Sequence, residues 1–213
     1  MIRLSHILPI LCAAMILSAT PLPKPAIPQD ATLAQSLQNR HSSRQYSGKP
    51  LSDQELSNLL WAAYGNNRPG EDKLTVPAAL NRHAFTLYVV TRDAVRKYLP
   101  LTHSLETVSE KDLLGLMEGR GTLGPDAGTA ILLTMNPERF TDLAKPGQPD
   151  NGVFYLGVEA GAICQDIYLY CVATGLSTVC CGSLHAIEIQ RELGLPASQK
   201  PVLTMIVGHA LEK

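Results

Sequence analysis

The longest apolar stretch of the chain extends from Gly152 to Thr174, where Glu159, Gln165 and Asp166 interrupt a run of apolar or small residues. A helix that is apolar on all sides must be buried over most of its surface, as a core helix or as a membrane span. Two carboxylates near its middle would be costly inside a bilayer, because no water solvates them there. The pattern therefore predicts a long helix in the core of a folded domain.

Small residues on this helix and directly after it indicate where another group could approach. Gly157, Ala160 and Gly161 leave room for a neighbouring backbone, for example the same helix of a second subunit. The helix is expected to stop at Gly175, before a short β-prone stretch, LSTVCCGS, at 176–183. A rigid helix that leads into a turn of small residues suits a site in which a flat ligand lies on the backbone.

A second helix is predicted over Leu51–Tyr64, where apolar residues recur at helical spacing. Ser52 and Glu55 match the capping box that begins such a helix, and Gly65 is expected to end it in the left-handed conformation. Arg92–Leu99 fits either a hairpin strand or a short helix. Shorter runs predict helices at Ala31–Gln38, Ser109–Met117 and His185–Leu195, and strands at Phe85–Thr91, Ala127–Met135 and Pro201–Val207.

Charge and motif spacing exclude several classes of protein. The formal net charge of −1, with no basic stripe that has interleaved aromatics, argues against a nucleic-acid partner. The sequence contains no GxSxG, so serine-hydrolase chemistry has no support. Residues 119–124 have GxGxxG spacing, but we expect a helix before them and a strand after them, the reverse of a dinucleotide fingerprint.

The first residues have the composition of a targeting segment. Arg3 and His6 precede the apolar run Ile7–Leu17, and small residues follow it. We predict that residues 1–20 form a signal peptide or membrane anchor, so that the protein is exported, periplasmic or membrane-anchored; the alternative is a cytoplasmic protein. Residues 21–36 are predicted to be a Pro-rich linker, and residues 37–213 a single folded domain.

Four cysteines follow the targeting segment. Cys164 and Cys171 are separated by about 10 Å along a helix, which is too far for a disulfide between them. We interpret them as small buried hydrophobic residues. No spacing of cysteine and histidine typical of a zinc site occurs, so no metal is predicted.

Residues 40–46, RHSSRQY, concentrate polar groups that suit an anion. Arg40 and Arg44 could each fork two phosphate oxygens, and a serine hydroxyl could donate a further hydrogen bond. The alternative interpretation is a solvated loop between helices.

Three separated stretches together resemble the FMN-dependent nitroreductase superfamily. Residues 40–46 are similar to its opening Arg-x-Ser-x-Arg/Lys-x-Phe/Tyr. Residues 76–83, VPAALNRH, resemble its Pro-Ser-x-x-Asn-x-Gln turn, and residues 175–183, GLSTVCCGS, resemble its Gly-Leu-x-x-x-x-x-Gly-Gly turn. The resemblance covers about residues 37–210. Residues 59–65, LLWAAYG, are similar to the subgroup that includes azoline dehydrogenases of modified-peptide pathways.

The resemblance implies an α+β fold: a three-layer α/β/α sandwich with a mixed central sheet and a long buried central helix. It also implies a homodimer whose two FMN sites lie across the interface. The expected function is an FMN-dependent oxidoreductase that transfers hydride through flavin N5 to a nitroaromatic, a quinone or a similar conjugated small-molecule acceptor. NAD(P)H or an envelope donor would supply the electrons. The alternatives are an azoline-type dehydrogenase or oxidase, and a non-catalytic flavin-binding module.

The resemblance assigns the phosphate side of the FMN site to the first stretch. Arg40 and Ser42 would bind the phosphate, with His41 beside them. Arg44 would lie by the N1/O2 edge of the isoalloxazine, where a fixed cation stabilises the negative charge of the reduced flavin.

The other two stretches would hold the ring of the flavin. Pro77 and Ala78 would line it, and Asn81 would hydrogen-bond its pyrimidine edge. The backbone from Cys180 and Cys181 to Gly182 and Ser183 would approach N5, and no protein side chain is assigned a catalytic role.

Two features depart from the pattern of the family. Ala78 stands where serine is usual and His83 where glutamine is usual. The adjacent Cys180 and Cys181 are unusual at the N5 edge, and they prompt the hypothesis of a strained vicinal disulfide that exchanges electrons with the flavin. The alternative is two packed thiols, because adjacent cysteines seldom meet disulfide geometry without strain.

Overall fold

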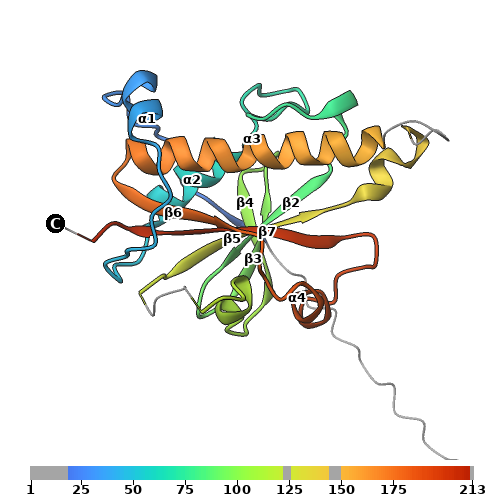
Figure 1. Cartoon of the computed structure of the whole chain (residues 1–213). Coiled ribbons are helices and arrows are strands. Elements are labelled where there is room, and N and C mark those ends of the chain that lie inside the picture. The colour runs from blue at the N-terminus through green and yellow to red at the C-terminus, as the bar shows by residue number, and fades with distance from the viewer. Residues whose placement is uncertain (1–18, 122–125, 144–149, 212–213) are drawn as a thin grey trace, which may run out of the picture.

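The computed structural model of the chain describes residues 19–121, 126–143 and 150–211. These residues form a seven-stranded sheet with helices on both faces (Figure 1). Neighbouring strands follow the order β1-β4-β3-β2-β5-β7-β6. The strands are β1 (Thr20–Pro21), β2 (Phe85–Val90), β3 (Val95–Leu99), β4 (Ser104–Ser109), β5 (Thr129–Met135), β6 (Leu176–Cys181) and β7 (Lys200–His209).

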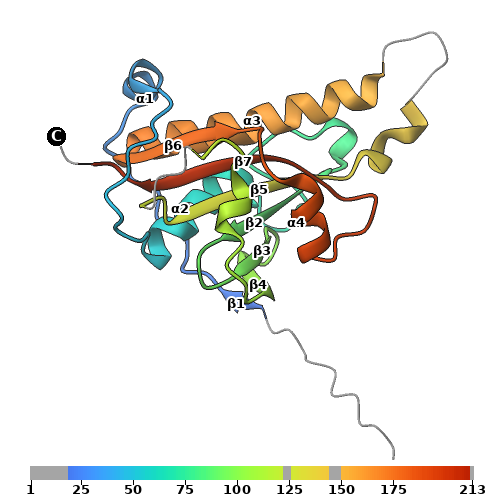
Figure 2. The same ribbon diagram turned by 60° about the horizontal axis from the view of Figure 1, so that its bottom comes forward.

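Helices cover both faces of the sheet and produce three layers. α2 (Asp53–Tyr64) and α3 (Asn151–Ala173) pack on one face (Figures 1 and 2). α4 (Ala186–Glu192) and the 3-10 turn η2 (Leu114–Met117) pack on the other. α1 (Leu33–Asn39) contacts α3. The expected α+β sandwich with a long central helix is confirmed.

Alternation along the strands divides the core into two clusters. In β2, Leu87 and Val89 are buried against α2 and α3, whereas Tyr88 and Val90 are buried on the α4 side. Successive side chains of a strand point to opposite faces, so a strand covered on both sides must be apolar throughout. This explains why β2 is apolar at nearly every position.

The pairing within the sheet differs from the expected mixed sheet. Every strand pair among the described residues is antiparallel. Short turns reverse the chain between β2, β3 and β4. The segment through α4 begins and ends at the same end of the sheet, so that β7 runs back along β6.

Helix α2 begins at its predicted cap. The Glu55 N–H donates to Ser52 Oγ at 3.3 Å, and the Ser52 N–H donates to the Glu55 carboxylate at 2.7 Å. The expectation of a left-handed Gly65 is wrong, since its φ of −82° is extended. Glycine is needed there for space, because a Cβ would lie 2.5 Å from Trp61 Cδ1 and 2.6 Å from the Trp61 carbonyl oxygen.

The helix predicted at Ser109–Met117 is also wrong. Ser109 is the last residue of β4, which pairs with β3, and only the short turn η2 remains of the helix. The Ser-x-x-Asp pattern is a local signal for a cap, and pairing with a neighbouring strand outweighs it here. The ambiguous Arg92–Leu99 segment contains β3 and is therefore a hairpin strand.

The segment predicted as a linker is docked on the domain. β1 pairs with β4 at the edge of the sheet, and the following prolines extend along α2 (Figure 2). Ser57 Oγ donates to the Pro23 carbonyl at 2.6 Å. The amide of Asn58 accepts from the Ala26 N–H at 2.8 Å and donates to the Ala26 carbonyl at 2.9 Å. Donors on α2 thus satisfy carbonyls of an extended Pro-rich chain, a conformation that has no regular backbone hydrogen bonds of its own.

Helix α3 buries one side and exposes the other. Ile163 and Ile167 are fully buried against the sheet, whereas Phe154 is 65% exposed and Val158 is 48% exposed. Within the described ranges no helix has the length and apolar character needed to cross a bilayer. The predicted targeting segment lies almost wholly outside those ranges.

Candidate functional site

The loop at 40–46 lies against the edge strand β6. The Ser43 N–H donates to the Thr178 carbonyl at 2.9 Å, and Ser43 Oγ lies 3.0 Å from Ser177 Oγ. Tyr46 forms an isolated antiparallel bridge with Ala210, beyond the end of β7. The loop therefore follows the sheet at the point where β6 and β7 are adjacent, and the first and third family-like stretches meet.

Tyr168 of α3 connects these two stretches. Its hydroxyl accepts a hydrogen bond from the Cys180 N–H at 2.9 Å and lies 2.9 Å from Ser42 Oγ. The guanidinium of Arg40 lies over its ring, 5.2 Å from the centroid, as in a cation–π contact. One side chain of the central helix thus positions both the loop and the strand.

The loop presents two exposed cations. Arg40 and Arg44 are both exposed, and neither forms an ion pair with a carboxylate of the described residues. His41 is also exposed, and its Nδ1 lies 2.6 Å from the Asn39 carbonyl. Guanidinium groups that no carboxylate neutralises can bind an incoming anion.

Arg44 influences the strand as well as the loop. Burial raises the pKa of the Cys181 thiol, and the nearby Glu118 raises it further, while the positive charges of Arg44 and Arg120 act in the opposite direction. Arg44 therefore lies close enough to the end of β6 to affect a charge that develops there.

The turn after β6 combines an open glycine with a tightly packed neighbour. Gly182 is exposed, and a Cβ there would meet only Leu203 Cδ2, at 3.7 Å. Ser183 packs on Gly119, where a Cβ would lie 2.2 Å from the Ser183 carbonyl oxygen. Gly119 is thus required for packing against this turn, and the backbone at Gly182 is left accessible.

The vicinal disulfide hypothesised for Cys180 and Cys181 is not present. All four cysteines of the described residues are free. Cys180 faces the α3 side of the sheet and Cys181 the α4 side, as expected for successive residues of a strand. The interpretation of Cys164 and Cys171 as buried small residues is confirmed.

The second family-like stretch, residues 76–83, has contacts of its own. Asn81, in the 3-10 turn η1 (Ala79–Asn81), accepts from Lys73 Nζ at 2.8 Å and donates to the Asp72 carbonyl at 3.0 Å. Pro77 is exposed and Ala78 is partly exposed. Within the described residues the Asn81 amide is therefore engaged by Lys73 and Asp72 and forms no hydrogen bond with the Arg40 loop.

The buried carboxylate of Glu159 shows which part of α3 the chain contacts just after this turn. Glu159 is 1% exposed, accepts from Tyr64 Oη at 2.7 Å, and accepts from the Ala84 N–H at 3.4 Å. Burial raises the pKa of Glu159, and the hydrogen bond from Tyr64 partly opposes the shift. Glu159 and Tyr168 are separated by roughly 14 Å along the helix axis, given a rise of 1.5 Å per residue. The two family-like regions thus flank different parts of the same helix.

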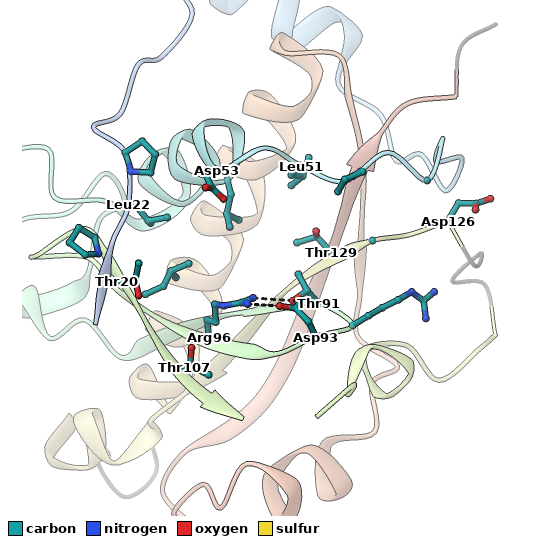
Figure 3. Close-up of a pocket in the computed structure, with 18 residues that line it drawn as sticks. Thr20, Leu22, Leu51, Asp53, Thr91, Asp93, Arg96, Thr107, Asp126 and Thr129 are labelled. Atoms are coloured by element: carbon teal, nitrogen blue, oxygen red, sulfur yellow. Dashed lines mark hydrogen bonds and ion pairs between the residues drawn. The ribbon is translucent and has the colours of Figure 1, made fainter. Parts of the chain in front are cut away.

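A cavity of about 700 Å³ lies apart from all of these residues (Figure 3). It is lined by β1, the start of α2 and the β2–β3 turn, with Thr129 of β5 on another side. Its Arg96 pairs with Asp93 at 2.5 Å and donates to Thr91 at 3.2 Å. Because this cation is neutralised within the wall, and because no predicted site residue lines the cavity, it is not the candidate site.

The sequence did not predict a role for Tyr168 or the approach of Cys164 to Cys180. Tyr168 and Cys164 lie one turn apart on the side of α3 that faces β6, within a run that reads as mainly apolar in sequence. A buried tyrosine hydroxyl normally needs a polar partner, which is the signal that could have identified Tyr168.

Comparison with proteins of similar sequence identifies the family to which the chain belongs. The model of the nitroreductase family matches residues 37–209. "Putative nitroreductase MJ1384" of Methanocaldococcus jannaschii is 32% identical over 193 residues, covering 86% of this chain and 94% of that protein. The chain therefore belongs to the nitroreductase family and is an oxidoreductase.

Solved structures agree with this assignment. The crystal structure of a "putative nitroreductase" from Ralstonia eutropha has a TM-score of 0.81 and 27% identity, and covers 92% of this chain and 90% of that one. The Escherichia coli microcin synthetase McbBCD complex with truncated pro-MccB17 bound contains a chain with a TM-score of 0.66. At 16% identity, over 99% of this chain and 85% of the other, the second likeness shows the fold alone.

Proposed function

We propose that the protein is an FMN-dependent oxidoreductase that reduces a nitroaromatic, a quinone or a similar conjugated small molecule. The observation that carries the proposal is the cluster in which Tyr168 joins Arg40 and Ser42 to the backbone of Cys180. FMN, when bound, supplies hydride and electron transfer at its N5 atom. NAD(P)H or an envelope protein would provide the electrons.

The residues of the cluster suit FMN in charge and in shape. Arg40 and Ser42, with His41 beside them, offer donors for the phosphate, and exposed Arg40 and Arg44 have no carboxylate partner among the described residues. Arg44 would stabilise negative charge on the ring. The open backbone at Gly182 would let a planar ring lie close to the peptide, where an N–H can donate to it.

We further propose that the site is completed by a second copy of the chain. Ala84, three residues after Asn81, donates to Glu159, which lies roughly 14 Å along α3 from Tyr168, and Asn81 itself contacts Lys73 and Asp72 rather than the cluster. The outer side of α3 is apolar and exposed at Phe154 and Val158, and a Cβ at Gly157 would meet no atom within 4 Å. Packing of α3 against a second subunit would bury this surface and could bring the partner's turn to the cluster.

The test is a visible absorption spectrum of the purified protein with FMN, recorded anaerobically before and after NADPH and then after dithionite. Bleaching of a bound flavin by NADPH supports the reductase. Bleaching of a bound flavin by dithionite but not by NADPH would still support the FMN site and would indicate an electron donor other than NADPH. Oxygen uptake with substrate but without nicotinamide would instead favour the azoline-type dehydrogenase. Bound flavin that exchanges readily and reacts with none of these would indicate a flavin-binding module.

A protein that does not take up FMN would contradict the proposal. Equilibrium dialysis against FMN provides this measurement independently of any reaction. A dissociation constant weaker than millimolar, with a folded protein by circular dichroism, would be the contradicting result.

We also propose that the protein is exported. The basis is the sequence of residues 1–20, and N-terminal sequencing of the protein from separated cell fractions tests it. A processed N-terminus in the envelope fraction would support export, whereas an intact Met1 in the cytoplasmic fraction would contradict it.

A further inference from the structure

Two cysteines from different elements meet beside the candidate site. Cys164 of α3 and Cys180 of β6 have their sulfur atoms 3.9 Å apart. Cys164 is 8% exposed, and Cys180 is partly exposed. The other two described cysteines differ, because Cys181 points to the opposite face of the sheet and Cys171 is fully buried. One thiol pair is therefore singled out by geometry.

We propose that Cys164 and Cys180 form a reversible dithiol–disulfide couple that links α3 to β6, with Cys180 as the attacking thiol. The sulfur atoms must approach by about 1.9 Å to reach a bond of about 2.0 Å. Rotation about the Cα–Cβ bonds of the two residues moves the sulfurs over distances of this size. The proposal does not depend on FMN, because both thiols belong to the chain.

The contacts of the pair assign its two roles. The contact between the two sulfur atoms lowers the pKa of the Cys180 thiol and raises that of Cys164. The thiolate is the nucleophile in thiol–disulfide exchange, and Cys180 is also the more exposed of the two. Cys164 is then the resolving thiol.

The oxidant is a disulfide of low molecular weight, such as glutathione disulfide. The Cys180 thiolate attacks one of its sulfur atoms, forms a mixed disulfide and releases one glutathione. Cys164, after loss of its proton, attacks the Cys180 sulfur and releases the second glutathione. The protein loses two electrons and two protons, and glutathione disulfide gains them as two thiols.

The position of the couple relates it to the site. The backbone N–H of Cys180 is the donor to Tyr168 Oη, and Tyr168 contacts Ser42 and Arg40. A covalent bond at Cys180 therefore lies two hydrogen bonds away from Ser42 in the loop at 40–46.

The test is peptide mapping of the full chain before and after glutathione disulfide. Free thiols are alkylated in denaturant, and a protease that cleaves before Asp166 separates Cys164 from the other three cysteines of this region. We expect a cross-linked peptide pair containing Cys164 and Cys180 after oxidation, and its loss after reduction. Full alkylation of both cysteines after oxidation, or a lasting glutathione adduct on Cys180 without a cross-link, would overturn the proposal.

Matched alanine variants assign the partners. Cys180→Ala should abolish the cross-link, whereas Cys181→Ala, at the adjacent position, should retain it. A cross-link that survives Cys180→Ala would overturn the assignment. Circular dichroism of each variant verifies folding. If a variant does not fold, fragmentation of the cross-linked peptide of the unchanged chain in a mass spectrometer shows whether Cys171, Cys180 or Cys181 is bonded to Cys164, since all three lie on residues 166–213. All samples are free of FMN. Absence of the cross-link would therefore overturn the disulfide proposal without bearing on the proposed FMN site, which the absorption spectrum tests separately.

Discussion

Tyr168 and Cys180 are joined by a hydrogen bond of 2.9 Å from the backbone N–H of Cys180 to the tyrosine hydroxyl. Tyr168 is on α3, and Cys180 is on β6, the edge strand of the sheet. An edge strand has backbone donors without a strand partner. The helix satisfies one of them and, through the same hydroxyl, holds Ser42.

The Tyr168→Phe variant tests this connection. Removal of the hydroxyl leaves the Cys180 N–H without its acceptor, and we expect the free energy of unfolding to fall by about 1 kcal/mol. FMN binding should weaken as well, because Ser42 loses its partner. Urea unfolding and flavin titration measure the two effects. Tyr155→Phe is the matched control, since the Tyr155 hydroxyl makes no hydrogen bond within the described residues. Equal effects of the two substitutions would argue against a special role for Tyr168.

The Arg40→Ala variant tests the anion-binding role of the loop. A charge-assisted hydrogen bond to phosphate contributes about 1.5–3 kcal/mol, so FMN affinity should fall about tenfold to a hundredfold. Stability should change little, because the side chain is exposed. Arg191→Ala removes an exposed arginine on α4 and serves as the control. Unchanged FMN affinity of Arg40→Ala would refute the phosphate assignment.

Substitution at Gly157 tests the proposed subunit contact. Gly157→Ala adds only a methyl group, whereas Gly157→Leu adds a side chain that a closely packed second helix could not accommodate. Neither change should harm the isolated fold, because a Cβ at Gly157 meets no atom within 4 Å and both residues favour helix over glycine. We expect Gly157→Leu to shift the protein toward a monomer in light scattering after size-exclusion chromatography. A dimer that is equally stable in both variants would place the contact elsewhere.

Asp166 gives a prediction about pH. Burial raises the pKa of Asp166 from 3.8 to about 6, and Asp166 lies in an apolar groove with Trp61 and Ala62. A carboxyl group with a raised pKa stabilises the fold fully below pH 3.8, and this contribution is lost as the pH rises through about 6. Asp166→Asn should therefore be more stable than the unchanged protein at pH 7.5, by about 1 kcal/mol after allowance for solvent screening of this half-buried group.

Measurement at a second pH distinguishes stabilisation through loss of the Asp166 charge from a stabilisation by asparagine that does not depend on charge. At pH 3.5 the unchanged protein also has a neutral side chain at 166, so the advantage of Asp166→Asn should disappear. Urea unfolding at the two pH values, at one fixed protein concentration, provides the comparison. An advantage that is the same at both values would mean that ionisation of Asp166 is not its cause.

Part of the fold follows from local sequence. The apolar run of α3, the Ser52–Glu55 capping box of α2 and the apolar, β-prone run of β2 are each encoded within a few neighbouring residues. Periodicity and capping depend on contacts between residues one turn or one strand position apart, and such contacts can be deduced from spacing. The sequence also contained all three family-like stretches in order.

Only the tertiary structure decided how these parts combine. Position 65 needs glycine because a Cβ would collide with Trp61, and Ser109 ends a strand because β3 pairs with it. The contact between Ser42 and Tyr168 joins residues far apart in the chain, and the 3.9 Å approach of Cys164 to Cys180 depends on how α3 lies on β6. Sheet register and helix packing determine these distances, and both result from the burial of the whole core rather than from any short stretch of residues.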